Sequence, residues 1–118
     1  VSGEFAVIKG IDYIMAAQAA EGAPVAFTFV EDGVLSLPSP IAIGKNARNA
    51  EAAAVFVDFI LSAEGQQVLV DKFFLPVRTD VAPPVGLPSP AEIVALEIDY
   101  EWLAEHGPEL RERFADLY

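Results

Sequence analysis

A carboxylate and a phenol stand side by side early in the chain, in the segment Lys9-Gly10-Ile11-Asp12-Tyr13. Asp12 can accept hydrogen bonds from an amine, and the Tyr13 hydroxyl can donate or accept one. The segment lies between an expected strand and an expected helix, and ligands of open α/β sheets bind where strands end. We therefore take Asp12 and Tyr13 as candidate ligand-binding residues. The alternative is that Asp12 caps the helix and Tyr13 packs half-buried.

Other residue combinations predict little chemistry. The only histidine, His106, precedes Gly107-Pro108 and is expected to be an exposed residue at a helix end. The acidic pair in Glu31-Asp32-Gly33 lacks the alternating oxygen ligands of a calcium loop, so a plain turn is expected there. No phosphate-binding glycine loop and no G-x-S-x-G nucleophile motif is present in the sequence. The sequence thus predicts no catalytic residue, no metal site and no cofactor, and the chain is not expected to be an enzyme.

Composition excludes further classes of function. The formal charge of −11 repels phosphate backbones and anionic lipid surfaces, so no nucleic-acid partner is expected. The sequence contains no cysteine, which excludes disulfides and thiolate chemistry. With 53% hydrophobic residues in 118, the chain has enough apolar side chains for the core of one domain. No run is as long as a membrane span, and any export signal is expected to lie upstream or to have been removed.

Hydrophobic patterning predicts an α/β fold. Short apolar or alternating runs predict strands, and a helix is expected between the first two of them. The expected strands cover residues 5–8, 25–30, 34–37 and 41–43, and the first helix covers 11–20. Asp32-Gly33 is a turn signal between two of these runs, because glycine accepts positive φ angles.

The stretch 44–67 predicts two consecutive helices. Ala52, Val55, Phe56, Phe59 and Ile60 share one helical face, which we expect to be buried, in a helix from about residue 50 to 61. Asn49 is the expected N-cap of this helix. Ser62 is the expected cap of a second helix that reaches about Lys72.

Five prolines between residues 75 and 90 predict an extended strap over the surface. Ser89 and Glu92 form a capping box with proline at the first helical position, which predicts a helix through about Glu97. Asp99 is expected to cap a further helix from Tyr100, broken or kinked at Gly107-Pro108 before residues 109–117.

Four phrases together resemble a family: GEFAVIKGIDY, then GAPVAFTFVEDGVLSLPSPIAIGKNARNAEAAAVFVDFILSAEGQQ, LPVRTDV and DYEWLAEHGPELRERF. The chain resembles the C-terminal part of an extracellular solute-binding protein of an ABC importer. More narrowly, it resembles the branch of ferric-iron, phosphonate and polyamine binders with the type II periplasmic fold. The resemblance covers nearly the whole chain and is most specific from Pro38 to Gln66.

The resemblance implies a single segment of a two-lobe α/β protein. Residues 1–37 would be part of the second lobe and the crossover, and residues 38–118 would supply the helices that return to the first lobe and the C-terminal helices. In ferric-binding relatives two adjacent tyrosines hold the metal, and these positions fall on Tyr13 and Ile14. With only one phenol present, an amine-bearing or hydrated solute beside Asp12 suits the site better than iron(III). Asp32 lies where the family chain approaches the inter-lobe region and is a further candidate.

Two functions from different classes follow. The first is non-catalytic capture of a small molecule or ion and its delivery to the membrane permease of an ABC importer, in the periplasm or outside the cell. The second is a self-standing structural or interaction module that oligomerises through exposed strand edges and apolar helix faces. A carboxylate-dependent hydrolase is a third possibility, which turnover abolished by Asp12→Ala would support.

Overall fold

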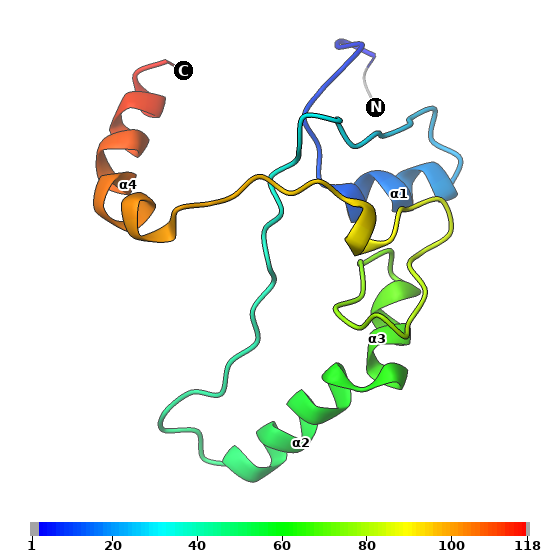
Figure 1. The fold of residues 1–118 in the computed structure, drawn as a ribbon, viewed down its shortest axis with the longest axis vertical. Helices are drawn as coiled ribbons and strands as arrows, with labels where there is room; N and C mark the ends of the chain where they lie inside the picture. The colour runs from blue at the N-terminus through cyan, green and yellow to red at the C-terminus, as the bar shows by residue number, and fades with distance from the viewer. Residues whose placement is uncertain (1–2, 118) are drawn as a thin grey trace.

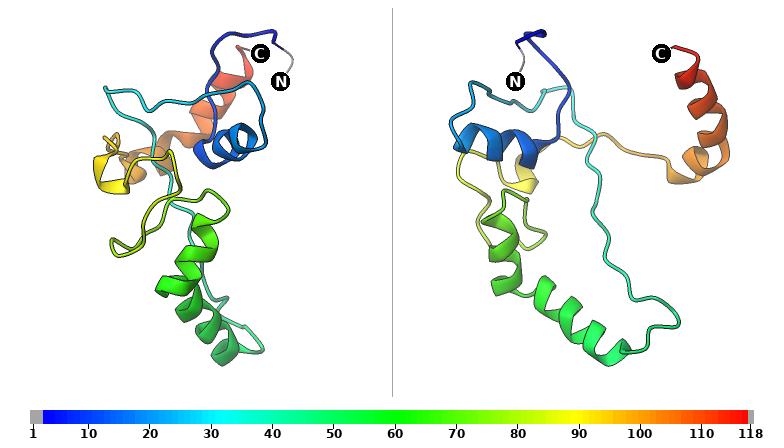
Figure 2. Two further views of the ribbon diagram at one scale, coloured as in Figure 1. Left: turned by 90° about the vertical axis from the view of Figure 1, so that its right-hand side faces the viewer. Right: turned by 180° about the vertical axis from the view of Figure 1, so that it is seen from behind.

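The computed structural model describes residues 3–117, and their regular structure is helical. The elements are α1 (Asp12–Ala20), α2 (Ala50–Leu61), α3 (Ala63–Val70), the 3-10 helix η1 (Pro90–Glu92) and α4 (Tyr100–Ala115). Figure 1 shows α1, α3 and η1 close together, with α2 extending from α3 on one side and α4 standing apart on another. Figure 2 shows the same separation of α2 and α4 from two further directions.

The predicted α/β architecture is not confirmed, because residues 3–117 contain no strand ladder. Two chain segments meet only in an isolated parallel bridge, Val34 with Ala95. The predicted strand 25–30 keeps the alternation of a strand, since Val25, Phe27 and Phe29 are half-buried and their neighbours are exposed. It has the side-chain pattern of a strand but no second segment with which to exchange backbone hydrogen bonds.

The predicted Asp-Gly turn is confirmed, but the hairpin is not. The Gly33 N–H donates to the Val30 carbonyl over 3.2 Å, and Gly33 has a φ of 113°. After the turn, the Val34 N–H donates to the Val94 carbonyl instead of returning to residues 25–30. A Cβ at Gly33 would lie 2.9 Å from the end of the Leu96 side chain, which can shift, so glycine is needed there mainly for its positive φ.

The predicted bounds of α2 are confirmed, but its predicted burial is wrong. The helix spans residues 50–61, with Asn49 at the N-cap position but without a side-chain capping hydrogen bond. Ala52, Val55, Phe56 and Phe59 of the predicted face are exposed, and only Ile60 at its edge is half-buried, together with Val57. The periodicity identified the helix correctly, but α2 is apolar on both sides, so it did not identify the face turned toward the chain.

Ser62 begins α3 as predicted. Its Oγ accepts a hydrogen bond from the Gly65 N–H and donates one of 2.6 Å to the Phe59 carbonyl. The helix ends at Val70, before the predicted end, and Phe73 just beyond has a φ of 69°. Among residues 3–117 no single helix has the length and apolar composition to cross a membrane. Only α2 and α3 taken together have the required length and composition, and the two helices are bent by 67°.

The proline-rich strap has no regular structure and turns at residues 79–80 and 85–86, and it combines exposed residues such as Val77 and Val85 with buried ones. Val81 and Leu87 are among the most buried apolar side chains, and Pro76 and Pro84 are also buried. Together with Val70 of α3, they form a small core under the strap. The strap thus replaces the missing sheet as the layer against which α3 packs.

The C-terminal predictions are partly confirmed. The capping box of Ser89 and Glu92 is present, but it starts only one 3-10 turn and not the predicted helix to Glu97. The chain becomes extended at Ile93 because the following residues form the bridge to Val34. Asp99 caps α4 as predicted, by accepting from the Trp102 N–H. The helix runs unbroken through Pro108.

Candidate functional site

The predicted ligand residues Asp12 and Tyr13 lie in the first turn of α1. Asp12 is the first helical residue and not the cap, since Ile11 occupies the N-cap position without a capping side chain. An acidic group in the first turn is favourable because it faces the positive end of the helix dipole. Both side chains are half-buried, which leaves part of each accessible to a solute.

Tyr13 is held by an aromatic partner from a distant part of the chain. Its ring stacks on Phe74, with ring centroids 4.3 Å apart and planes 21° apart. Phe74 follows α3, and the bond from the Phe74 N–H to the Leu69 carbonyl fixes its backbone at the end of that helix. The stack joins α1 to α3 and restricts the Tyr13 ring. The packing alternative for Tyr13 is therefore realised, and it also orients the phenol.

Asp32 is not brought together with the other two candidates by any contact in residues 3–117. It is exposed in the turn between Val30 and Gly33, and neither Asp12 nor Asp32 forms a hydrogen bond with Tyr13. The described residues contain no group of three or more His, Asp or Glu side chains suited to hold a metal ion. The candidate ligand-binding site in the described residues thus consists of Asp12 and Tyr13, which would contact a solute from one side.

His106 differs from its prediction. It lies within α4 and not at a helix end, is half-buried, and stacks on Trp102 with ring centroids 4.4 Å and planes 11° apart. Its Nδ1 is 2.9 Å from the Trp102 carbonyl oxygen, a contact that requires the proton on Nδ1. The imidazole thus contacts its own helix, and within residues 3–117 no carboxylate or nucleophile forms a hydrogen bond with it.

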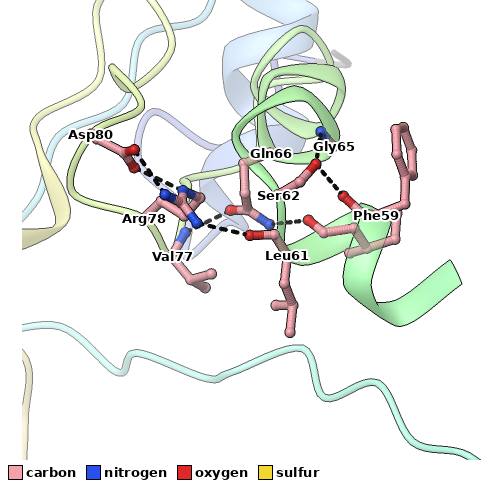
Figure 3. Close-up of polar contacts among 9 residues, drawn as sticks. Phe59, Leu61, Ser62, Gly65, Gln66, Val77, Arg78 and Asp80 are labelled. Carbon is pink, nitrogen blue, oxygen red and sulfur yellow. Dashed lines mark hydrogen bonds and ion pairs between the residues drawn. The ribbon is translucent and has the colours of Figure 1, made fainter. Parts of the chain in front are cut away.

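The most connected polar cluster, which sequence reasoning did not single out, closes the corner between α2 and α3. Gln66 is 2% exposed, and its Nε2 donates to the Ile60 carbonyl while its Oε1 accepts from the Val77 N–H, both over 2.8 Å. Arg78 donates to the Leu61 carbonyl over 3.3 Å. Figure 3 shows these groups side by side, with the strap residues meeting the end of α2.

Asp80 completes this cluster by pairing with Arg78. The Nε and Nη2 of Arg78 each donate to one carboxylate oxygen of Asp80 over 2.8 Å. The hydrogen bond from Arg78 is the main cause that lowers the pKa of Asp80 below its ordinary value, and the positive charge acts in the same direction. The side chains of Gln66, Arg78 and Asp80 all have partners within the cluster, so the cluster fixes the backbone at the corner between α2, α3 and the strap. The sequence did contain a signal for this cluster. Gln66 and Arg78 lie in two of the phrases on which the family resemblance rests, the one that ends in AEGQQ and LPVRTDV.

Comparison with known proteins identifies the family. Searches of curated proteins and of solved structures gave no match for this chain. The sequence model of a family described as bacterial extracellular solute-binding protein matches residues 1–106. This match includes α1 with Asp12 and Tyr13, the α2–α3 corner, and the strap that closes it. The chain belongs to the bacterial extracellular solute-binding protein family.

Proposed function

We propose that this chain takes part in capturing a solute for delivery to an ABC importer, without breaking or forming a covalent bond in the solute. The observation that carries the proposal is the family match over residues 1–106, which contains every candidate ligand residue. Solute-binding proteins of the type II periplasmic fold, which this family suggests, hold their ligand between two lobes. A periplasmic or cell-surface location follows from the same proposal.

The proposed contact on this chain is made by Asp12 and Tyr13, with Asp32 as a more peripheral contributor. Asp12 supplies a negative charge in a half-buried position, and Tyr13 supplies a phenol oriented by Phe74. A cationic amine would form a charge-assisted hydrogen bond with the carboxylate, and the overall charge of −11 attracts cations. We therefore favour an amine-bearing solute over a phosphonate, which both charges repel, and over iron(III), for which Ile14 leaves one phenolate too few.

The proposal is tested by calorimetric titration of the protein with spermidine, with an alkylphosphonate and with ferric citrate. Spermidine is expected to bind and the other two to bind at least tenfold more weakly. Asp12→Asn should weaken spermidine binding by about tenfold, because a hydrogen bond to a charged group is lost, and Tyr13→Phe by less. Glu51→Gln is the matched control, since Glu51 lies in the first turn of α2 and should leave affinity unchanged.

Two results would contradict the assignment. Equal affinity of the Asp12→Asn variant and the unaltered protein would remove Asp12 from the site. Tight binding of ferric citrate that depends on Tyr13 would contradict an amine as the solute and indicate a metal instead. The proposal of solute capture would still hold.

A further inference from the structure

The backbone at the end of α3 is unusual. The Phe73 N–H donates to the Val70 carbonyl over 2.8 Å. The Phe74 N–H donates to the Leu69 carbonyl over 3.1 Å. These two bonds around a left-handed residue make up a Schellman motif, in which that residue is usually glycine. Here it is Phe73, with a φ of 69°, and within residues 3–117 every other residue of positive φ is a glycine.

Phe73 is therefore in a strained conformation, which its surroundings must maintain. A side chain in the left-handed region is strained because its Cβ lies too close to the following carbonyl oxygen. Such strain persists only where the surrounding structure holds the residue in that conformation. Phe73 is half-buried and lines a groove between α3 and the proline-rich strap, together with Pro83 and Pro84. The position of its ring beside the strap thus helps to hold the strained backbone.

The conformation of Phe73 decides where the next side chain lies. A helical residue at position 73 would continue α3, and the Phe74 N–H would then not reach back to the Leu69 carbonyl. With the left-handed residue, the chain leaves the helix axis at the end of α3 that lies toward α1 (Figure 1). Phe74 stacks there on Tyr13, with ring centroids 4.3 Å apart. The two phenylalanines thus connect the strap, through the end of α3, to a candidate ligand residue.

We propose that Phe73 and Phe74 are positioning residues of the solute site. The left-handed conformation of Phe73 directs Phe74 onto Tyr13, and the stack holds the Tyr13 hydroxyl where it can form a hydrogen bond with a solute bound by Asp12. The inference rests on the proposed function, because it assigns Tyr13 to the solute. Neither phenylalanine needs to contact the solute, so their effect on affinity must act through the Tyr13 hydroxyl.

Proton NMR of the tyrosine rings tests the positioning without any solute. The Phe74 ring should shift the ring-proton resonances of Tyr13 upfield, and Tyr13→Phe identifies these resonances by their loss. Phe74→Leu should abolish the upfield shift. Phe73→Val should abolish it too, because a β-branched residue does not readily adopt a positive φ, whereas Phe73→Gly should keep it. Phe29→Leu is the matched control, since Phe29 is half-buried in a separate aromatic pair and should leave the shift unchanged.

Titration with spermidine tests the consequence for affinity. Phe74→Leu and Phe73→Val should each weaken binding about threefold, the usual effect of losing one neutral hydrogen bond. Phe73→Gly and Phe29→Leu should leave the affinity unchanged. In the Tyr13→Phe background, Phe74→Leu should weaken binding no further, because the hydroxyl through which it acts is already absent.

Several outcomes would overturn the inference. They are a Tyr13 resonance without an upfield shift in the unaltered protein, loss of the shift in Phe73→Gly, and equal spermidine affinity of Phe74→Leu and the unaltered protein. An effect of Phe74→Leu that persists in the Tyr13→Phe background would show a general structural role instead. If circular dichroism shows that Phe73→Val has lost its helices, the comparison of Phe74→Leu with Phe29→Leu decides.

Failure of the proposed function gives a different result. If the unaltered protein does not bind spermidine, the proposed solute is wrong. The ring-proton shifts would still decide whether Phe73 and Phe74 set the position of Tyr13, because they are measured without solute.

Discussion

The corner between α2 and α3 and the stretch from residue 23 to residue 49 contain comparable apolar sequence but differ in how they are held. At the corner, side chains form hydrogen bonds with the backbone. Ser62 caps α3, and Gln66 joins Ile60 to Val77. In the stretch 23–49, the apolar side chains are exposed or half-buried, and only Val34 forms a bridge to another segment.

The two regions also differ in how far along the chain their hydrogen-bond partners lie. The partners at the corner lie within 17 residues of one another along the chain, so the loops between them are short. In the stretch 23–49, Val34 bonds to Val94, far along the sequence, and not to the nearby residues 25–30, and closing so long a loop costs more chain entropy. Weakening the corner tests this difference between the two regions. Four substitutions are expected to lower the free energy of unfolding, each by less than the one before.

Gly65→Ala should have the largest effect. A methyl group at this position would lie 2.0 Å from the Phe59 carbonyl oxygen, which is backbone and already accepts from Ser62. The two helices must move apart, and we expect a loss of about 3 kcal/mol in the free energy of unfolding. Urea unfolding followed by circular dichroism measures it, with Gly44→Ala, which meets nothing within 4 Å, as the control. Equal midpoints for the two variants would contradict the close packing at Gly65.

Gln66→Met should cost about 2 kcal/mol, because it removes both side-chain hydrogen bonds while keeping the side-chain length. The Val77 N–H and the Ile60 carbonyl would lose partners that lie at 2.8 Å. The exposed neighbour Gln67, whose side chain donates to Asp71 in the following turn, gives the control Gln67→Met. If both variants unfold at the same urea concentration, the two hydrogen bonds of Gln66 do not stabilise the attachment of the strap.

Ser62→Ala should cost about 1 kcal/mol, the usual effect of losing an N-cap. The Gly65 N–H loses its acceptor at the start of α3. The same urea titration measures the effect, and Ser36→Ala, at an exposed position outside any helix, should be close to neutral. A neutral Ser62→Ala would mean that packing alone defines the corner.

The Arg78–Asp80 pair should have the smallest effect, since both groups are on the surface. The pKa of Asp80 lies below its ordinary value of 3.8, so the pair contributes fully above that pH. The contribution is lost as the pH falls through the lower folded value, when Asp80 becomes protonated. Stability measured from neutral pH into acid should fall less steeply for Asp80→Asn than for the unaltered chain. Parallel pH profiles would show that the pair contributes nothing.

Helix boundaries could be predicted from the sequence because their signals are local. Ser62, Ser89 and Asp99 each accept a hydrogen bond from an N–H two or three residues ahead, within reach of the same turn. The helix expected to Glu97 did not form because residues 94–96 bond to Val34, far away in the sequence. Local capping thus started η1, and a distant partner ended it.

The candidate site shows the same limit. The place of Asp12 and Tyr13 at the start of a helix followed from the preceding apolar run and the helix pattern. The stack of Tyr13 on Phe74 could not be predicted, because no sequence pattern near Tyr13 indicates that it contacts an aromatic ring after α3. The burial of Val81 was also missed, because proline content predicts an extended backbone but not what the backbone covers.

The bridge between Val34 and Ala95 has a consequence for the order of folding. Its two hydrogen bonds, from the Val34 N–H to Val94 and from the Leu96 N–H to Val34, close a loop that contains α2, α3 and the strap. Closing so long a loop for two bonds is unfavourable until the enclosed segments are already compact. The bridge should therefore be the last contact made and the first to open, and α4 beyond it gains its fixed position only at the end of folding.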